Sequence, residues 1–325
     1  MHILAVRARR HARIATARQG VASPADRAAA IVGLLALGVA ALPHVLDTDG
    51  LALDAPGDRR ADATPVDGRS AYTTASGREI VFGAYSGASH THRSAVRITN
   101  PGKVDLTVKD FDWIGMPFKS PIYYGLRAQN WSSPGVAVGS MLDFTHAKAI
   151  ARASDLAAFS GTRSGTPVPP TARIGDVFKH LEFSHGHNMV TLNGLYRMPA
   201  FWTRVRPYFG AGAGIALPHT EIGFRDEKER TYQYQFAGLV GQLLAGLEIS
   251  LGRSSVFVEY KFSFAPYEVP LSHEPYGWLV VTDVWQQFRA WAMREAAPGG
   301  RLSTNLATHH AITGVLVRAG HAPER

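Results

Sequence analysis

The chain has 325 residues, no cysteine and a formal net charge of +8. The lack of cysteine excludes a disulfide framework, a thiol nucleophile and a cysteine-ligated zinc or iron–sulfur site. Residues 1–27 contain six arginines and one aspartate, and +8 minus +5 leaves +3 for the rest of the chain. That balance is too weakly basic for nucleic-acid binding, which needs a dense basic stripe, and it is compatible with an anionic lipid surface.

The N-terminal part of the chain is typical of an exported protein. Its arginines precede an apolar run over 28–42, which ends at Pro43. The run is shorter than the about 20 apolar residues that a membrane-spanning helix needs, so we predict a signal peptide or an N-terminal anchor over 1–46. Residues 47–76 are rich in Asp, Pro, Gly and Arg and have no apolar period, which predicts a disordered periplasmic linker.

The remaining region, 77–320, alternates apolar with polar residues in short segments. These segments lie at about 79–88, 122–131, 136–144, 188–197, 204–217, 232–250, 256–264 and 304–318. A period of two turns one face of each strand toward lipid and the other toward a small polar lumen. An even number of such strands closes a barrel without open edges. We therefore predict an all-β fold, an eight-stranded antiparallel transmembrane β-barrel of a Gram-negative outer membrane.

The connections between these segments differ in length, which predicts the orientation of the barrel. Three are short, at 132–134, 198–203 and 251–253, and four are long, at 89–121, 147–187, 218–231 and 265–303. Bacterial barrels keep short turns in the periplasm and long loops outside. The last long loop contains an insertion at about 273–303, in which apolar residues recur at near-helical spacing over 279–294. We predict a short amphipathic helix there, either a lid or an interfacial helix.

Several blocks of this region resemble a known family, and they occur in the same order. They include Asp143-Phe144-Thr145-His146-Ala147-Lys148 and Thr308-His309-His310, with further blocks at 119–127, 181–188, 206–212 and 259–261. Over about 79–318 the chain resembles the rhizobial lipid A oxidase family of outer-membrane barrels. The resemblance implies that the proximal glucosamine of 1-dephosphorylated lipid A is oxidised to 2-aminogluconate by O2, with release of peroxide. It also implies contact with lipopolysaccharide, outer-membrane lipid and the barrel-assembly machinery.

Two pairs of histidines are spaced for metal binding at the predicted outer ends of strands. One residue separates the rings within each pair, His90 with His92 and His185 with His187, so both rings of a pair point to one side of an extended strand. Imidazoles on one face of a sheet suit iron, copper, manganese or zinc. We predict that these four histidines bind a divalent or redox metal. The sequence contains no flavin or nicotinamide motif.

The same outer rim supplies groups for acid–base chemistry and for holding the substrate. Oxidation of a hemiacetal needs a base for the hydroxyl proton, and the remaining phosphate or acyl carbonyls of the substrate need basic partners. The predicted catalytic residues are His146, His185, His187, His310, Asp143 and Glu182, and the predicted substrate-binding residues are Lys119, Arg127 and Lys148.

Other interpretations of these residues stay open. The inward-pointing charges are better explained as a paired ionic core without a catalytic role than as catalytic groups, because an unpaired buried charge is costly. They are Arg127, Asp143, Arg206, Glu259 and Lys261. A non-enzymatic barrel with a structural or adhesion role needs no clustered histidines. A lipid A deacylase would use a Ser–His–Asp/Glu arrangement, for which Ser184, Ser89 and Thr145 lie beside histidines in the sequence.

Overall fold

The computed structural model describes residues 78–133, 137–202, 204–271, 280–295 and 300–319. The predicted signal peptide at 1–46, the linker at 47–76 and part of the loop insertion lie outside these residues. The described part is dominated by strands that pair antiparallel, which confirms the all-β class. The strands form one sheet in which β1 also pairs with β16, so the sheet closes on itself.

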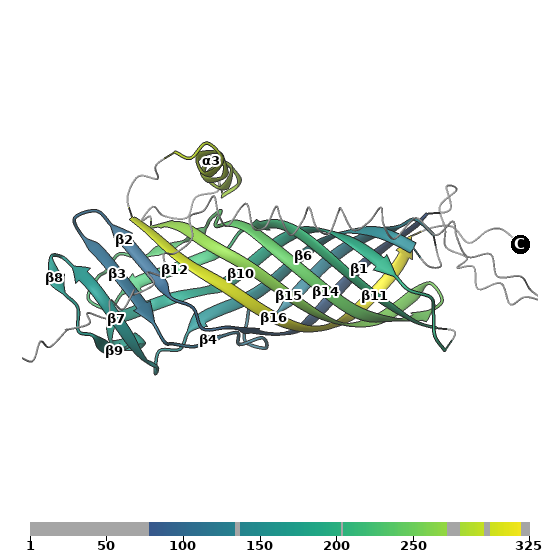
Figure 1. Cartoon of the computed structure of the whole chain (residues 1–325), viewed down its shortest axis with the longest axis horizontal. Coiled ribbons are helices and arrows are strands. Elements are labelled where there is room, and N and C mark those ends of the chain that lie inside the picture. Colours follow the sequence, from purple (N-terminus) through teal and green to yellow (C-terminus); the bar gives the residue numbers. More distant parts are fainter. Residues whose placement is uncertain (1–77, 134–136, 203, 272–279, 296–299, 320–325) are drawn as a thin grey trace, which may run out of the picture.

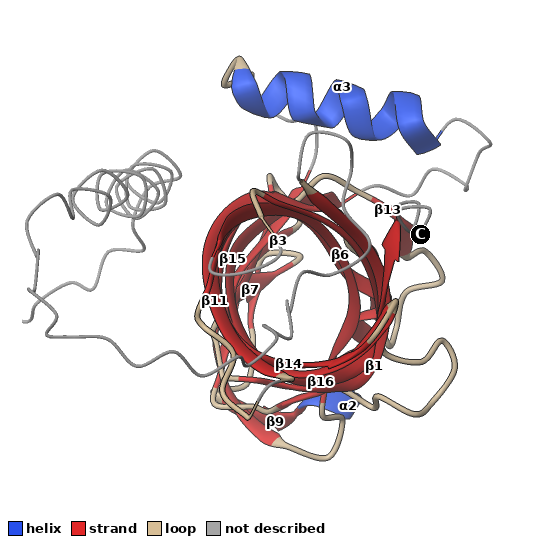
Figure 2. Ribbon diagram, turned by 90° about the vertical axis from the view of Figure 1, so that its right-hand side faces the viewer, coloured by secondary structure: helices blue, strands red, loops and turns tan. Residues whose placement is uncertain are grey.

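Within the described residues, eight strands form the closed ring seen end-on in Figure 2. In ring order they are β1 (Glu79–Thr91), β5 (Tyr124–Trp131), β6 (Ala137–Ala151), β10 (Phe178–Arg197), β11 (Val205–Ala216), β14 (Gly238–Leu251), β15 (Ser254–Leu271) and β16 (Gly300–Ala319). Each segment predicted from alternation contributes to one of these strands. Several strands run further than predicted at the end away from the short turns, as β10 and β15 do.

Beyond the ring, short strands continue the sheet at one end of the molecule (Figure 1). They are β2 (Val96–Asn100), β3 (Val104–Lys109), β4 (Trp113–Ile114), β7 (Leu156–Arg163), β8 (Thr166–Pro167), β9 (Thr171–Arg173), β12 (His219–Phe224) and β13 (Thr231–Tyr234), with the short helix α2 (Ile174–Val177). The prediction that 89–121, 147–187 and 218–231 are loops is therefore wrong over much of their length. Val96, Ile98, Leu106 and Val108 alternate with polar residues and are fully buried, which gives this extension its own apolar core.

Helix α3 (Val280–Ala292) lies within the predicted loop insertion and across the outside of the ring (Figure 2). It is held by Phe288 and Trp291, whose rings each lie 5.3 Å from the ring of Phe236. The side-chain oxygen of Gln287 accepts a hydrogen bond of 2.9 Å from the backbone N–H of Phe236. Among the described residues, none of the helices has the length and apolar character needed to cross a membrane.

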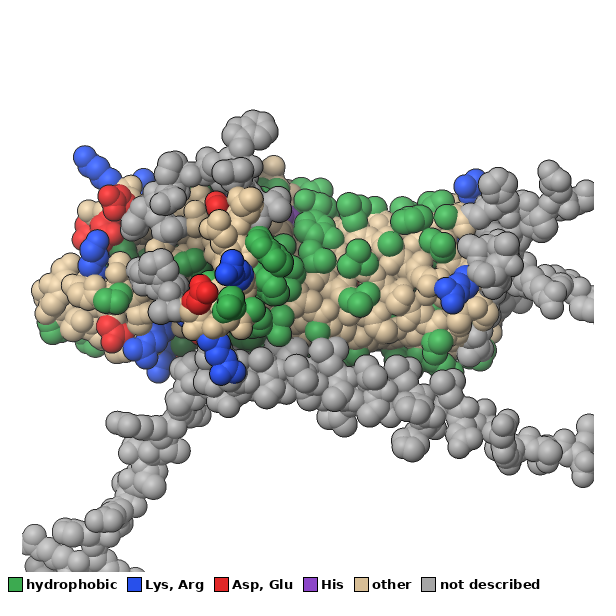
Figure 3. Space-filling model, turned by 90° about the horizontal axis from the view of Figure 1, so that it is seen from above, with side chains coloured by type: hydrophobic (Ala, Val, Ile, Leu, Met, Phe, Trp, Pro, Cys, Tyr) green, Lys and Arg blue, Asp and Glu red, His purple; other side chains and the backbone are tan. Residues whose placement is uncertain are grey.

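The outer wall of the ring carries an apolar belt. The outward positions of its strands hold large exposed apolar side chains, among them Phe82, Leu126, Leu142, Leu192, Phe209, Leu243, Val258 and Val315. Charged side chains gather mainly over the strand extension, whereas the wall of the ring shows apolar and uncharged groups on the face in Figure 3. An exposed apolar surface of this extent is unusual for a monomer in water and marks a lipid or protein contact.

Candidate functional site

A polar cluster occupies the outward face of the barrel wall immediately beyond the apolar belt. Leu142, Phe144, His146 and Lys148 follow one another on a single face of β6, because side chains alternate along a strand. Asn188 of β10 lies opposite His146, and Glu182 of β10 lies opposite Glu221 of β12. We call His146, Lys148, His180, Glu182, His185, Asn188 and Glu221 the outer-wall cluster.

His146 presents one unpaired ring nitrogen within this cluster. The residue is 4% exposed, and its ring stacks on Tyr124 with centroids 4.8 Å apart. Its Nδ1 lies 2.8 Å from Oδ1 of Asn188, and the amide nitrogen of Asn188 donates to the backbone carbonyl of Leu217 at 3.2 Å. That second bond orients the amide, so His146 must donate from Nδ1 and keep its lone pair on Nε2. Nε2 is buried and has no hydrogen-bond partner within the described residues.

Lys148 places a buried cation beside His146. The residue is 3% exposed, and its Nζ donates to the backbone carbonyl of Lys119 at 2.7 Å. In the described part of the chain, no carboxylate lies within ion-pair distance of this ammonium. Burial lowers the pKa of Lys148, and the nearby charge of Lys119 lowers it further, while Glu182 opposes the change. A buried ammonium with a single carbonyl partner favours an anionic ligand. Lys119 itself contributes its carbonyl, and its side chain is exposed.

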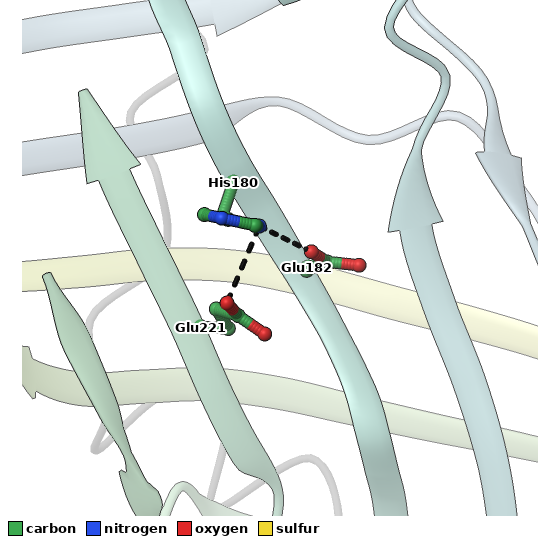
Figure 4. Close-up of side chains that lie close together, drawn as sticks. All are labelled: His180, Glu182 and Glu221. Carbon is green, nitrogen blue, oxygen red and sulfur yellow. Dashed lines mark hydrogen bonds and ion pairs between the residues drawn. The ribbon is translucent and has the colours of Figure 1, made fainter. Parts of the chain in front are cut away.

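Three other members of the cluster point toward one another in Figure 4. Nδ1 of His180 lies 2.8 Å from Oε1 of Glu182 and 3.3 Å from Oε1 of Glu221. Arg230 also forms an ion pair with Oε1 of Glu221. The ring of His185 is part of the same surface, since its Nδ1 lies 3.9 Å from Oε2 of Glu221. The sequence prediction included Glu182 and His185 but missed His180, although its period-two spacing from Glu182 placed both on one face.

His219 borders the outer-wall cluster. Its ring lies 5.0 Å from that of His185 and 4.5 Å from that of Tyr232. Burial, and secondarily the charge of His185, lowers the pKa of His219 to about 4. The ring is therefore neutral at physiological pH and adds no positive charge to the cluster.

His187 and His310 lie inside the barrel and not on its wall. His187 is fully buried and hydrogen-bonded through Nδ1 to the hydroxyl of Tyr267. His310 bonds Tyr123 through Nδ1 at 3.0 Å and Ser263 through Nε2 at 2.9 Å. Both ring nitrogens of His310 are thus occupied, which leaves no lone pair to act as a base on an external substrate.

The prediction that His185 and His187 point to one side is wrong. The pairing of β10 with β6 shifts register between Phe183 and His187, and Gly186 adopts a φ of +142° in this bulge. A bulge inserts an extra residue and re-aims the side chains that follow. His185 therefore contacts Glu221 on the outward face, whereas His187 contacts Tyr267 inside.

His90 and His92 do share one side, as predicted, but they belong neither to the outer-wall cluster nor to the interior of the barrel. Their rings lie 5.6 Å apart, and Nε2 of His92 lies 2.5 Å from Nε2 of His309 on β16. Tyr260 contacts the other nitrogen of His309. This group lies on β1, on the residue that follows it, and on β15 and β16, and β5 separates it from the outer-wall cluster on β6, β10 and β12. The four histidines that we predicted to bind one metal therefore lie in three separate places: His90 with His92 beside His309, His185 beside Glu221, and His187 beside Tyr267.

Arg127 and Asp143 form an ionic core inside the ring. Arg127 donates to both oxygens of Glu259 at 2.8 and 2.9 Å and to Asp143 at 3.2 Å. Lys261 pairs with the other oxygen of Asp143, and Tyr208 donates to Glu259 at 2.7 Å. All four charged side chains are buried. Their mutual pairing supports the structural interpretation and removes Arg127 and Asp143 from contact with an external substrate.

The class of molecule defined by these observations is a closed antiparallel β-barrel with an apolar outer wall and a polar site beside it. No family model matches the chain, and no curated protein sequence matches it. Among solved structures the chain is similar to Neisserial surface protein A (NspA), with a TM-score of 0.31 at 8% sequence identity. That similarity covers 74% of this chain and 97% of NspA.

Proposed function

We propose that the chain is an outer-membrane β-barrel enzyme that oxidises the proximal glucosamine of 1-dephosphorylated lipid A to 2-aminogluconate with O2. The observation that carries the proposal is the position of the outer-wall cluster directly beyond the apolar belt. From Ala137 to His146, β6 runs for about ten residues, and a tilted strand crosses a bilayer in roughly 9–11. A site on the lipid-facing wall at this level meets the headgroup of a lipid in the adjacent leaflet.

The orientation of the barrel supports a position of the outer-wall cluster at the outer leaflet of the membrane. The short β10–β11 and β14–β15 turns lie at the end opposite the extended strands, and bacterial barrels keep such turns in the periplasm. The outer-wall cluster lies at the end with the strand extension, which is then the external end. Lipid A occupies that leaflet, so the sugar reaches the site without transport across the membrane.

The proposed chemistry uses His146, Lys148 and the other imidazole and carboxylate groups of the cluster. Nε2 of His146 accepts the proton of the anomeric hydroxyl, and Lys148 binds a phosphate or acyl carbonyl of the substrate. C1 loses its hydrogen and two electrons, O2 accepts two electrons and two protons, and the products are a lactone and hydrogen peroxide. Water then opens the lactone to the acid. A redox metal held by the imidazole and carboxylate groups of the cluster would supply an electron path to O2.

The test of this proposal is mass spectrometry of lipid A from cells that express or lack the chain, combined with oxygen uptake by the purified protein. We expect a gain of about one oxygen on the proximal sugar and oxygen consumption that depends on 1-dephosphorylated lipid A. Loss of an acyl chain without oxygen uptake would indicate a deacylase. Unchanged lipid A in both assays would contradict the enzymatic proposal.

A second candidate is a non-enzymatic barrel that presents the strand extension at the cell surface. The filled ionic interior favours it, because Arg127, Asp143, Glu259 and Lys261 pair with one another and stabilise the ring without any catalytic role. The hydrolase alternative receives less support. Ser184 and Glu221 both approach Nδ1 of His185, at 3.3 and 3.9 Å, whereas a catalytic triad uses the two different ring nitrogens.

The membrane assignment predicts a strong dependence of stability on position for charged substitutions. Leu192→Arg should destabilise the barrel by about 2–4 kcal/mol in a bilayer, because Leu192 faces outward near the middle of the belt. Leu156 of β7 is the matched control, since it is 66% exposed and Leu192 is 64% exposed. Leu156→Arg lies in the strand extension and should change the free energy of unfolding by less than about 0.5 kcal/mol. Urea unfolding in lipid vesicles measures both, and equal effects would contradict the membrane assignment.

A further inference from the structure

We infer that His180, Glu182 and Glu221 form a binding site for one divalent metal ion of the manganese, iron or zinc class. Each residue offers one ligand atom, and the three atoms lie within 4.8 Å of one another. Two strands contribute the ligands: His180 and Glu182 lie two residues apart on β10, and Glu221 lies directly opposite Glu182 on β12. The metal ligands predicted from sequence, His90, His92, His185 and His187, do not include any of these three.

The arrangement of charges favours a cation over a simple salt bridge. Like charges directly opposite on paired strands repel each other, and Glu182 and Glu221 occupy such a pair. Arg230 forms an ion pair with Oε1 of Glu221, whereas within the described residues the ion-pair partner of Glu182 is His180. The Glu221 side chain is only 5% exposed, which reduces screening by water and increases the cost of this repulsion.

A single atom of His180 already bridges the two carboxylates. Its Nδ1 lies 2.8 Å from Glu182 and 3.3 Å from Glu221, so a proton on Nδ1 occupies the position between both acids. A divalent ion attracts both carboxylates more strongly than one shared proton does, and the imidazole can bind the ion through Nδ1 while it carries its own hydrogen on Nε2. The mixture of one imidazole and two carboxylates suits manganese, iron or zinc and does not suit a soft ion such as Cu(I).

Neighbouring groups leave room for further ligands. Nδ1 of His185 is 3.9 Å from Oε2 of Glu221, and its side chain is 45% exposed, so a rotation about its side-chain bonds brings a second imidazole to the ion. Three or four protein ligands leave coordination positions for water, O2 or a sugar hydroxyl. The site is also electrostatically linked to the groups that we assign to the substrate, because Glu182 acts on Lys148 and His185 acts on His146.

Metal binding at this site stands apart from the proposed oxidase activity. The use of the metal in oxidation rests on that proposed function, and it requires manganese or iron because zinc has no redox chemistry. The two claims can therefore fail separately. Protein that binds the metal but leaves lipid A unchanged would support the metal site and contradict the proposed oxidase activity. Protein that oxidises lipid A but binds no metal would contradict the metal site and support the proposed oxidase activity.

The experiment uses the full chain, folded in detergent and freed of metal with a chelator. We titrate it with Mn²⁺ and follow the loss of the free-ion signal by electron paramagnetic resonance. We expect one ion per chain, and Glu221→Gln and His180→Ala should each weaken binding by at least about tenfold. Co²⁺ should give the absorption bands of a nitrogen- and oxygen-ligated ion, and His180→Ala should reduce the nitrogen contribution.

Two controls keep the test decisive. His309→Ala removes an imidazole of the separate group on β16 and should leave Mn²⁺ affinity unchanged, because His309 does not contact the site. Heat-modifiable migration on a gel checks that each variant retains its folded barrel, and Glu182→Gln replaces any variant that fails this check. Unchanged Mn²⁺ affinity in folded His180→Ala and Glu182→Gln proteins would overturn the inference, as would equal loss in His309→Ala.

Discussion

Arg127→Met should destabilise the barrel by about 3–5 kcal/mol, the largest effect on stability that we expect from any single substitution in the ring. Arg127 donates two hydrogen bonds to Glu259 and one to Asp143, and all three side chains are fully buried. Removing the guanidinium takes away the ion-pair partner of Glu259 among the described residues and leaves the hydroxyl of Tyr208 as its side-chain donor. The shift of the urea midpoint, at unchanged slope, measures the loss.

The control for Arg127→Met is Arg97→Met. Arg97 pairs with Asp105 at 3.1 Å on the strand extension, and both side chains are mostly exposed. An exposed ion pair contributes at most about 1 kcal/mol, so the same substitution there should change stability little. The double variant Arg127→Met/Glu259→Gln should recover part of the loss, since it removes the uncompensated charge. Absence of recovery would show that lost packing, and not the buried charge, causes the destabilisation.

The inward charges were predictable from sequence because a regular strand fixes which face each side chain occupies. Asp143 alternates with Leu142 and Phe144, and Glu259 alternates with Val258 and Tyr260, and the structure places the acids inside and the apolar residues outside. The shared face of His146 and Lys148 was not predicted, because the strand was expected to end near 144, whereas β6 continues to Ala151. Period-two alternation is a local property, so it requires no knowledge of which strands pair.

The wrong predictions have a different physical origin, because they depend on which strands pair and in which register. The register shift at Gly186 separates His185 from His187, and a period-two pattern contains no signal for a bulge. Glu221 reaches the outer-wall cluster only because β12 pairs with β10, and that pairing joins distant parts of the chain. The strands β2 and β3 were visible as alternating residues, but their span was assigned to a loop on the basis of connection length alone.

The largest effect on activity is expected from His146→Gln, which should lower the rate of lipid A oxidation by about 10²–10⁴-fold. Asn188 and Leu217 fix the ring so that Nε2 keeps its lone pair, and a glutamine amide nitrogen has no comparable basicity. If His146 acts as the base, the loss should fall mainly on kcat, because the substrate is still bound through Lys148. Lys148→Met should instead raise KM with a smaller change in kcat, since it removes a binding contact.

The matched control for this prediction is His309→Gln, which makes the same substitution on the outer wall of the barrel but outside the outer-wall cluster. It should retain the oxidation rate of the unmodified protein, and both variants should keep heat-modifiable migration. Oxygen uptake with 1-dephosphorylated lipid A gives kcat and KM for each. If folded His146→Gln protein oxidises lipid A at the unmodified rate, the proton leaves by another route and the outer-wall cluster is not the reaction centre. If His309→Gln is the inactive variant, the centre lies with His90, His92 and His309 on the other side of β5.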